Sequence, residues 1–389
     1  MGIPQKSLSV VHVSQSTDAG VGSYVATLAL DQVGRSWDVT VVCPPVLLPD
    51  HTLAKRAQQS GARAIQWRAT RSPGMHLLSE TIRLRRILRA LPADIVHFHS
   101  SKAGLAGRLA VRGRTPTVFQ PNAWSFWALS GPLRRLAVHW ERMATRWTDM
   151  IICVSEGELL AATEAGFGSI ARLVPNAVDL DALAPASAAD RRRARVRLCL
   201  NDAPYVVCVG RLSHQKGQDV LLDAWATVKR SVPHARLVLV GTGPLLAELE
   251  ARNVPDVEFV GFRDDVSEWL VAANVVAFPS RWEGMSFTLL EAMACARSVV
   301  TTDVPGVSEL LDGGGGAVVP SENREALAAA LIRRLRNSPK TDAEGAAGRR
   351  SMETTHGLDQ MCQSVAEVYG AVLAERADSY RTTRRSVLL

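Results

Sequence analysis

The sequence predicts an α/β protein of two consecutive doubly wound domains, each with a parallel sheet covered by helices on both faces. Short runs rich in Val and Ile alternate with helical patterns along almost the whole chain, and this alternation is typical of parallel sheets. It breaks once, at 176–204, and then resumes. The length of 389 residues also suits two domains. Ligands of such sheets bind at the carboxyl ends of the strands, so we seek functional residues in the loops that follow them.

The first domain is expected to span residues 1–180. Its strands are predicted from short apolar runs bounded by Gly, Pro or polar residues, and its helices from the longer stretches between them. The expected strands are Leu8–Val13, Val39–Cys43, Ala62–Trp67, Ile95–Phe98, Thr117–Gln120, Met150–Val154 and Arg172–Val174. The expected helices are Gly22–Val33, Met75–Ala90, Lys102–Val111 and Leu133–Thr148.

Residues 181–204 are expected to link the domains, because this segment has Pro185, an Ala/Ser run and a charged helix (Asp190–Leu200) but no strand. The second domain is expected to span 205–357. Its expected strands are Tyr205–Gly210, Arg236–Gly241, Val257–Val260, Val275–Pro279, Ser298–Thr301 and Ala317–Val319. Its expected helices are Gln218–Arg230, Leu245–Arg252, Val266–Ala273, Ser286–Ala294, Val307–Leu311 and Arg324–Arg336.

The composition places the chain among folded proteins of the cytoplasm. Hydrophobic residues make up 47% of it, which excludes global disorder and supplies two cores. No run of about 18 apolar residues occurs, so no membrane span is expected. The six cysteines stand singly, mostly in apolar runs, and the N-terminal residues lack the pattern of a secretory signal.

The positive charge is concentrated in the first domain. Residues 1–180 carry 20 Lys and Arg against 12 Asp and Glu, whereas residues 181–389 carry 25 against 26. A solvated surface is the simplest interpretation of this charge. A peripheral contact with the anionic inner face of a membrane, or with a lipid-linked acceptor, stays open, and nucleic acid is not expected as a partner.

Two carboxylates flank the start of a predicted helix in the second domain. Glu283 lies in the loop after a buried strand, and Glu291 follows eight residues later on the helix itself. The backbone N–H groups of 284–287 stand at the helix start, where they lack helical partners. Carboxylates that accept hydrogen bonds from hydroxyls, beside N–H groups that donate to anion oxygens, suit a sugar nucleotide. Two solvated glutamates are the alternative.

Two cations precede the next predicted helix start. Arg211 and Lys216 lie between the strand that ends near Gly210 and the helix that starts at Gln218. The helix macrodipole makes this an unfavourable place for positive charge unless an anion binds there. A diphosphate fits, because Arg grips two oxygens and Lys acts as a point charge. Two exposed surface cations are the alternative.

The glycines of two further loops are weaker signals. Gly20 and Gly22 follow the first strand, and Gly243 follows the strand Arg236–Gly241; each allows a close backbone approach or simply makes a turn. His97 and His99 end the strand 94–98, and we place them on opposite faces, where they do not share one ion. No metal site is therefore expected.

Taken together, these segments resemble the retaining glycosyltransferases of family 4, the group 1 glycosyl transferases. The resemblance is carried by Gly210-Arg211…Lys216-Gly217, Gly241-Thr-Gly243-Pro244, Gly261-Phe262 and Glu283-x7-Glu291. It covers nearly the whole chain and implies the GT-B fold, two Rossmann-like domains facing across a cleft, the first binding acceptor and the second nucleotide sugar. A C-terminal helix at 358–375 would cross back to the first domain, and 376–389 would be a polar tail.

The resemblance also implies roles for single residues. Arg211 and Lys216 would hold the donor diphosphate, Glu291 the ribose hydroxyls, and Glu283 the transferred hexosyl group. The donor-binding set it implies is Gly20, Gly22, Arg211, Lys216, Gly243, Phe262, Arg263, Glu283, Gly284, Met285, Ser286, Phe287 and Glu291, of which Arg211, Lys216 and Glu283 would be catalytic. The mechanism would be front-face substitution with retention and without a metal ion.

The acceptor side carries less transferable pattern. Asn122 stands after Pro121 where many relatives have His, and the neighbouring segments are similar to bacterial members that build polysaccharides or glycosylate secondary metabolites. The acceptor-side candidates are His99, Lys102, Asn122 and Trp124. Two alternatives stay open: a sugar-nucleotide epimerase on the same fold, and a protein that binds a nucleotide sugar without turning it over.

Overall fold

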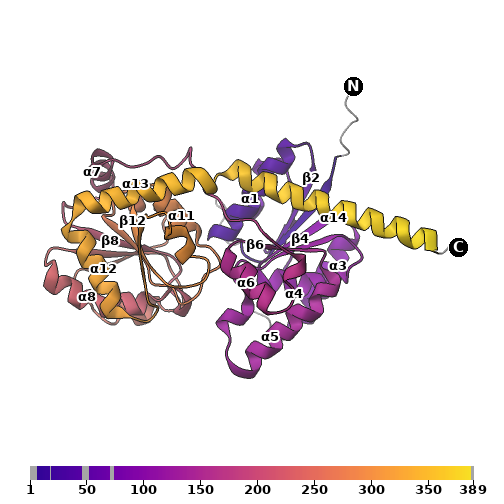
Figure 1. Cartoon of the computed structure of the whole chain (residues 1–389), viewed down its shortest axis with the longest axis horizontal. Helices are drawn as coiled ribbons and strands as arrows, with labels where there is room; N and C mark the ends of the chain where they lie inside the picture. Colours follow the sequence, from indigo (N-terminus) through magenta and orange to yellow (C-terminus); the bar gives the residue numbers. More distant parts are fainter. Residues whose placement is uncertain (1–6, 18, 46–51, 71–73, 387–389) are drawn as a thin grey trace. The chain divides into compact units, whose positions relative to one another are not determined.

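The computed structural model describes residues 7–17, 19–45, 52–70 and 74–386, and it contains two compact units. The first unit is formed by Met1–Pro175 together with Asp359–Leu389, and the second by Asn176–Leu358 (Figure 1). Each has a single parallel sheet, as the alternation of strands and helices predicts. Among the described residues we find no helix whose length and hydropathy suit a membrane span.

The first unit is built on a parallel sheet of order β3-β2-β1-β4-β5-β6-β7. The chain therefore moves outward from β1 in one direction and then resumes at β4 on its other side. The strands are β1 (Ser9–Ser14), β2 (Asp38–Cys43), β3 (Arg63–Gln66), β4 (Ile95–His99), β5 (Thr117–Gln120), β6 (Met150–Cys153) and β7 (Ala171–Leu173). The helices are α1 (Ala19–Gly34), α2 (Leu53–Gln59), α3 (Leu77–Arg89), α4 (Ser100–Val111), α5 (Gly131–Ala144), α6 (Glu156–Glu164) and α14 (Leu358–Ser386).

Two glycines of α4 face aromatic rings of the sheet of the first unit. A Cβ added to Gly104 would stand 2.2 Å from the ring of Phe119, and one added to Gly107 would stand 2.1 Å from the ring of Phe98. The two glycines therefore make room for aromatic rings between helix and strands. Both rings are fully buried, and such burial is the main source of stability in a core.

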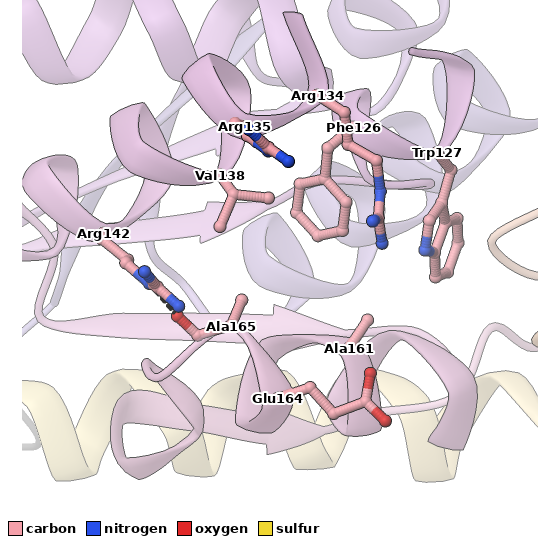
Figure 2. Close-up of a pocket in the computed structure, with 9 residues that line it drawn as sticks. All are labelled: Phe126, Trp127, Arg134, Arg135, Val138, Arg142, Ala161, Glu164 and Ala165. Atoms are coloured by element: carbon pink, nitrogen blue, oxygen red, sulfur yellow. Dashed lines mark hydrogen bonds between the residues drawn. The ribbon is translucent and has the colours of Figure 1, made fainter. Parts of the chain in front are cut away.

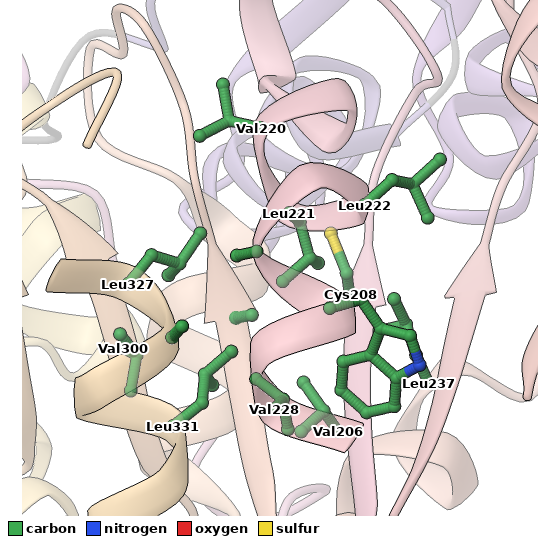
Figure 3. Packing of buried hydrophobic residues seen from close by; sticks show 14 of the residues in the cluster. Val206, Cys208, Val220, Leu221, Leu222, Val228, Leu237, Val300, Leu327 and Leu331 are labelled. Carbon is green, nitrogen blue, oxygen red and sulfur yellow. The ribbon is translucent and has the colours of Figure 1, made fainter. Parts of the chain in front are cut away.

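The second unit has a sheet of order β10-β9-β8-β11-β12-β13. In Figure 3 the apolar side chains of α8 and α12 meet those of the central strands. The strands are β8 (Tyr205–Val209), β9 (Arg236–Val240), β10 (Val257–Gly261), β11 (Val275–Phe278), β12 (Ser298–Thr302) and β13 (Gly316–Val319). The helices are α7 (Ala188–Arg197), α8 (Gln218–Ser231), α9 (Leu246–Glu250), α10 (Val266–Ala272), α11 (Phe287–Ala294), α12 (Arg324–Arg336) and α13 (Ser338–Thr355).

The segment expected as a linker belongs to the second unit. Its helix α7 starts with a capping box, in which Ser187 and Asp190 each accept a hydrogen bond from the other's backbone N–H. Arg195 of α7 donates to the Ala272 carbonyl at the end of α10, with an Nε to oxygen distance of 3.1 Å. The short helix expected at 307–311 forms only one 3-10 turn, Ser308–Leu311.

The last helix is longer than expected and packs on the first unit. The predicted polar tail at 376–389 continues α14 as far as Ser386, and residues 387–389 lie outside the described part of the chain. Tyr369 is fully buried, and Arg376 donates to both carboxylate oxygens of Asp149. The predicted helix at 358–375 is therefore present, and only its continuation to Ser386 was missed, because a polar segment was expected to end the helix.

Candidate active site

The carboxyl edge of the second sheet brings several functional loops together. The chain leaves β8 toward β9 and β10 and then returns to β11 on the other side of β8. In doubly wound sheets, ligands bind in the crevice outside the carboxyl ends of the strands at such a reversal. The loops after β8 and β11 carry Arg211, Lys216 and Glu283.

Lys216 and Glu283 are in direct contact. Lys216 ends a 3-10 turn, His214–Lys216, and its Nζ lies 2.5 Å from Glu283 Oε1. Ser280 Oγ donates to the same oxygen at 2.7 Å. Glu283 is 7% exposed, whereas Lys216 is half-buried. The pair therefore places a cation and a carboxylate side by side at the crevice, a contact that the sequence did not predict.

The two loops are held together by their backbones. Arg281 N donates to Gln215 O at 2.7 Å, and Gln215 Nε2 donates to Trp282 O at 3.0 Å. Between them Gly217 adopts a φ of +64°, and a Cβ there would stand 1.9 Å from Pro279 O. Only glycine fits at that point, so the approach of the loops depends on this residue.

Arg211 is a second cation at the same edge. Its carbonyl accepts a hydrogen bond from the buried side chain of Gln218 at 3.1 Å, which fixes its backbone. Its guanidinium has no hydrogen-bond or ion-pair partner among the described residues. An anion at the crevice would supply that partner.

Glycines also shape the neighbouring loop after β9. Gly241 has a φ of +135°, and a Cβ on it would lie 2.2 Å from Gly210 O. A Cβ on Gly243 would lie 2.2 Å from Leu212 O. Gly243 therefore allows a close approach between two parts of the protein, the loops after β8 and β9. A contact between Gly243 and a donor stays a prediction.

A row of backbone amides follows Glu283. Gly284, Met285 and Ser286 are buried, and their N–H groups donate to no other described residue. Asn176 Nδ2 donates to Met285 O at 3.0 Å, so the peptide is held in place from the opposite side. Phe287 then begins α11. A helix start of this kind is suited to negatively charged oxygen atoms.

Glu291 is the second carboxylate of this helix. It is half-buried and has no partner among the described residues. Burial raises the pKa of its carboxyl to about 7. A carboxyl group that is removed from water and unpaired would gain from hydroxyl donors of a ligand.

Phe262 and Arg263 follow β10, and only Phe262 has a side chain without a polar partner that is open to a ligand. Phe262 is 63% exposed, so its ring is available to a flat ligand group. Arg263 forms a two-point ion pair with Asp265, at 2.8 and 2.6 Å. Its charge is therefore already compensated.

Gly20 and Gly22 lie in the first turns of α1 in the first unit. A Cβ on Gly22 would stand 2.5 Å from Thr17 O, so a side chain is excluded at this position. The structure does not test a ligand contact at either glycine, and their donor-binding role stays a prediction.

Most acceptor-side candidates are part of the core of the first unit. Lys102 is 4% exposed and its Nζ lies 2.6 Å from Glu80 Oε2. Trp124 is 1% exposed and donates from Nε1 to Glu158 O at 3.0 Å. His99 is fully buried. In this structure these three side chains are not accessible to an acceptor, because each serves the packing of its own unit.

Asn122 is the one acceptor-side candidate of the four whose side chain is partly exposed. It has a φ of +51° and exchanges hydrogen bonds with Gln120, whose Nε2 donates to Asn122 Oδ1 at 3.1 Å. Asn tolerates this left-handed conformation better than most residues. A contact between Asn122 and an acceptor stays a prediction.

The expectation that His97 and His99 lie on opposite faces is wrong, because alternate residues of a strand point to the same side. Their ring centroids are 3.9 Å apart. His12 of β1 joins them, with its Nδ1 2.9 Å from His99 Nε2 and its Nε2 2.8 Å from Gln32 Oε1. One nitrogen from each of the three rings could bind an ion, and these nitrogens lie within 4.8 Å of one another.

Burial governs the charge of this histidine cluster. It lowers the pKa of His12 to about 4 and the pKa values of the other two rings well below their usual range. His97 Nδ1 lies 2.7 Å from the Tyr369 hydroxyl, so the last helix takes part as well. The three rings are therefore neutral near pH 7, and the absence of a metal stays a prediction.

Sequence reasoning missed the residues that position the site. Ser280 binds Glu283, Gln218 holds the loop after β8, and Asn176 anchors the peptide before α11. Only Asn176 acts over a long distance in sequence, 109 residues, whereas Ser280 and Gln218 contact residues three and seven positions away. All three are at most 2% exposed, and a buried polar residue is the signal that the structure adds.

Two protein-family models match the chain. The model described as Glycosyltransferase Family 4 matches residues 19–182, and the model described as Glycosyl transferases group 1 matches residues 203–337. Together they cover most of both units.

Curated relatives come from bacterial glycan biosynthesis. A GDP-mannose-dependent alpha-(1-6)-phosphatidylinositol monomannoside mannosyltransferase of Mycolicibacterium smegmatis is 31% identical over 356 residues, 85% of this chain and 89% of the relative. The lipopolysaccharide core biosynthesis mannosyltransferase LpsB of Rhizobium meliloti is 32% identical over 198 residues, 47% of this chain. In that case the chain spans about half of the relative, 56%. A UDP-Gal:alpha-D-GlcNAc-diphosphoundecaprenol alpha-1,3-galactosyltransferase of Escherichia coli is 29% identical over 243 residues, 59% of this chain and 62% of the relative.

Solved structures show the same fold. The Anabaena protein Alr3699/HepE, in complex with UDP and glucose, superposes with a TM-score of 0.78 at 21% identity, over 93% of this chain and 99% of that one. WaaG, a glycosyltransferase involved in lipopolysaccharide biosynthesis, superposes with a TM-score of 0.72 at 19% identity, over 92% of this chain and 99% of that one. The predicted GT-B architecture of two parallel-sheet domains is confirmed.

Proposed function

The chain belongs to the family 4 and group 1 glycosyltransferases, and we propose that it transfers a hexosyl unit from a nucleotide-diphosphate sugar to a hydroxyl group with retention of configuration. The donor is a UDP-sugar or, as the second choice, a GDP-sugar. The acceptor is a polysaccharide intermediate, a lipid-linked glycan or a secondary metabolite. The contact between Lys216 and Glu283 is the observation that carries the proposal.

This contact supports a donor site because it joins the two functions that a nucleotide sugar needs. Lys216 supplies positive charge to the diphosphate, together with the unpaired guanidinium of Arg211. Glu283 is an acceptor for sugar hydroxyls and is held by Ser280. The amides of 284–286 add donors from the same edge.

The proposed chemistry uses this charge at the leaving group. As the bond between the sugar carbon and the diphosphate oxygen breaks, negative charge grows on the diphosphate and the sugar becomes cation-like. Fixed cations and a helix start stabilise that charge as it forms. The acceptor oxygen attacks from the leaving-group side, and its proton passes to the departing phosphate. We assign no protein nucleophile and no resident metal to the step.

The donor is identified by calorimetric titration with UDP, GDP and their hexose conjugates, in the presence and absence of a chelator. We expect one conjugate to bind equally well in both conditions and to lose at least about 10-fold in affinity in Lys216→Ala, the loss of one charge-assisted bond. Arg324→Gln, an exposed residue of α12, is the control and should bind normally.

The reaction is then followed by the configuration of the product and by nucleotide release. Acceptor-dependent release of nucleotide with an α-linked product from an α-linked donor supports the proposal. Conversion of the donor without acceptor would show an epimerase instead. Binding without any turnover, across glycan and lipid-linked acceptors, would show a binding protein.

We also propose that the first unit meets the anionic inner face of a membrane through its basic residues. The relatives from M. smegmatis and E. coli are named for lipid-linked substrates, which supports a membrane-borne acceptor. Binding to anionic vesicles should weaken steeply with added salt. Salt-independent or absent binding contradicts this part of the proposal.

A further inference from the structure

Arg281 lies in the loop after β11, two residues before Glu283, and its guanidinium contacts other segments of the second unit. Its Nη1 and Nη2 donate to the two carboxylate oxygens of Asp219 at 2.9 and 2.7 Å. Nη1 also donates to His214 O at 2.7 Å, and the guanidinium forms an ion pair with Glu322. The side chain is 12% exposed. One guanidinium group therefore bonds to three separate segments.

The partners of Arg281 lie on both sides of Lys216 along the chain. His214 is the first residue of the 3-10 turn that Lys216 ends, and Asp219 stands in the first turn of α8. Arg281 N also donates to Gln215 O at 2.7 Å, so the backbone between these partners is held as well. The loop that carries Lys216 is therefore bonded to Arg281 both before and after the lysine.

The charge of Arg281 is already compensated by the protein. Burial alone would raise the pKa of the Asp219 carboxyl, but the hydrogen bonds and the charge of Arg281 outweigh burial and hold that pKa below its ordinary value. Glu322 adds a second carboxylate. Arg211, by contrast, has no carboxylate partner among the described residues and is free to bind a diphosphate. Arg281 is therefore suited to hold the two loops rather than to bind the donor.

An arginine joins two elements in a similar way on the first unit. Arg142 of α5 donates from Nε to Ala165 O, just beyond the end of α6, in a groove lined by both helices (Figure 2). A guanidinium that reaches a main-chain carbonyl fixes backbone, and its five N–H donors let it join more than two segments. Arg281 differs in its place, because the segments that it joins include both loops of the candidate donor site.

We propose that Arg281 is a positioning residue of the donor site: it fixes the loop after β8 against the loop after β11 and thereby sets the contact between Lys216 and Glu283. The proposal rests on the proposed function and deepens it, because it names the side chain on which the geometry of this cation and carboxylate depends. Lysine has a flexible side chain, and a reacting group displaced by about 1 Å can cost about 100-fold in rate. A backbone held on both sides of Lys216 limits that displacement.

Arg281→Gln is tested in a double-mutant cycle with Lys216→Ala. We expect Arg281→Gln alone to lower the calorimetric affinity for the donor conjugate by about 5- to 10-fold and kcat/KM by about 10- to 100-fold. In the Lys216→Ala background it should lower each quantity by less than about 3-fold, because the side chain that Arg281 positions is then missing. Losses that multiply in the double variant would show an independent structural role and would overturn the assignment.

Two further variants separate the shape of the guanidinium from its charge. Arg281→Lys keeps the charge but cannot donate in parallel to Asp219 and His214 O, so we expect it to recover only part of the loss. Arg197→Gln removes a comparable ion pair of the same unit, in which two nitrogens contact Glu268 at 3.0 and 2.6 Å. This control should keep the affinity and the rate of the wild type. Full recovery in Arg281→Lys would show that charge alone matters and would contradict the positioning role.

Hydrogen exchange of the ligand-free protein tests the same role without any substrate. Peptides that cover 213–219 should exchange at least about 3-fold faster in Arg281→Gln than in the wild type or in Arg197→Gln, because the loop opens locally more often. Peptides of β9 should keep their rate, which also shows that the variant is folded. If no nucleotide conjugate binds the wild type, the proposed function fails, and exchange still decides whether Arg281 holds the loop. Unchanged exchange at 213–219 would overturn the inference whether or not a conjugate binds.

Discussion

At the scale of single residues, the second unit compensates the charge of Lys216 with Glu283 before any ligand binds. Burial costs the Glu283 carboxylate its hydration, and the contacts with Lys216 and Ser280 offset that cost. The sequence predicted both residues as functional from their loops. It did not predict that they touch, because 67 residues separate them along the chain.

Glu283→Gln should separate binding from catalysis. The amide can keep the hydrogen bond with Ser280 but no longer carries charge, so its contribution to the cation-like sugar is lost. We expect kcat/KM to fall by at least about 100-fold, while the affinity for the free nucleotide diphosphate does not fall, because Lys216 loses its carboxylate partner and keeps its charge for the diphosphate. Steady-state kinetics and calorimetry measure the two effects. Glu325→Gln, an exposed residue of α12, is the matched control, and a parallel loss of both quantities in Glu283→Gln would contradict a role at the sugar.

Glu291 should make the stability of the ligand-free protein depend on pH. Its folded pKa, about 7, lies above the ordinary value of 4.5, so between these pH values the folded state binds more protons than the unfolded state. Its contribution to the free energy of unfolding is therefore complete below pH 4.5 and is lost as the pH rises to 7.

The buried histidines also make the free energy of unfolding depend on pH. Their lowered pKa values make it rise with pH below 6.5, which is opposite to the effect of Glu291. Comparison of the wild type with Glu291→Gln isolates the contribution of Glu291. We expect the free energy of unfolding of the wild type, relative to that of the variant, to fall between pH 4.5 and 7 in urea titrations. A difference that stays constant over this range would show that the carboxyl is not buried in the way described.

At the scale of elements, the site depends on two strand-to-helix loops that approach within van der Waals contact. Gly217, with its positive φ, lets the loop after β8 reach the carbonyl of Pro279. The sequence located both loops, since buried strands and helix starts are visible as local patterns. Their contact depends on the pairing of β8 with β11, which no local pattern contains.

Gly217→Ala should disturb both stability and donor binding. The added methyl group would stand 1.9 Å from Pro279 O at a left-handed backbone position, so the two loops must move apart. We expect a loss of at least about 2 kcal/mol in unfolding free energy and weaker donor binding, measured by denaturant titration and calorimetry. Gly370→Ala, at a helical position with open space, is the control and should keep both. Unchanged donor binding in Gly217→Ala would mean that the loop contact does not position Lys216.

At the scale of the whole molecule, the chain ends in the unit in which it begins. α14 contributes Tyr369 and Val365 to the core of the first unit and binds Asp149 through Arg376. The hydroxyl of Tyr369 also lies 2.7 Å from His97 Nδ1. The first unit is therefore incomplete without the last 31 residues of the chain, from Asp359 onward.

Tyr369→Ala should destabilise the first unit. The change leaves a cavity and an unpaired nitrogen of His97 in a fully buried place. We expect a loss of about 3–5 kcal/mol in unfolding free energy, and Tyr369→Phe should lose only about 1 kcal/mol, the hydrogen bond alone. Hydrogen exchange should localise the loss to β1 and β4, and an equal loss in the second unit would contradict the division into two units.

Local patterns in the sequence predict the strands of both sheets, the class of fold and the loops in which Arg211, Lys216 and Glu283 stand. These follow from local properties: the apolar runs that a buried strand needs, and the glycines and charges that stand where strands give way to helices. α2, α6 and α13 escaped prediction, since a helix with one buried face has a weaker pattern than a buried strand.

Which of the predicted residues a ligand can reach depends on the tertiary structure. Lys102, Trp124 and His99 are chemically suited to bind an acceptor, yet each is buried against a partner from another element. Lys216 and Glu283 were equally plausible as separate surface residues, and the pairing of β8 with β11 brings them together. The physical reason is that burial and contact depend on which strands are neighbours, and that order is set by packing of the whole unit rather than by any local segment.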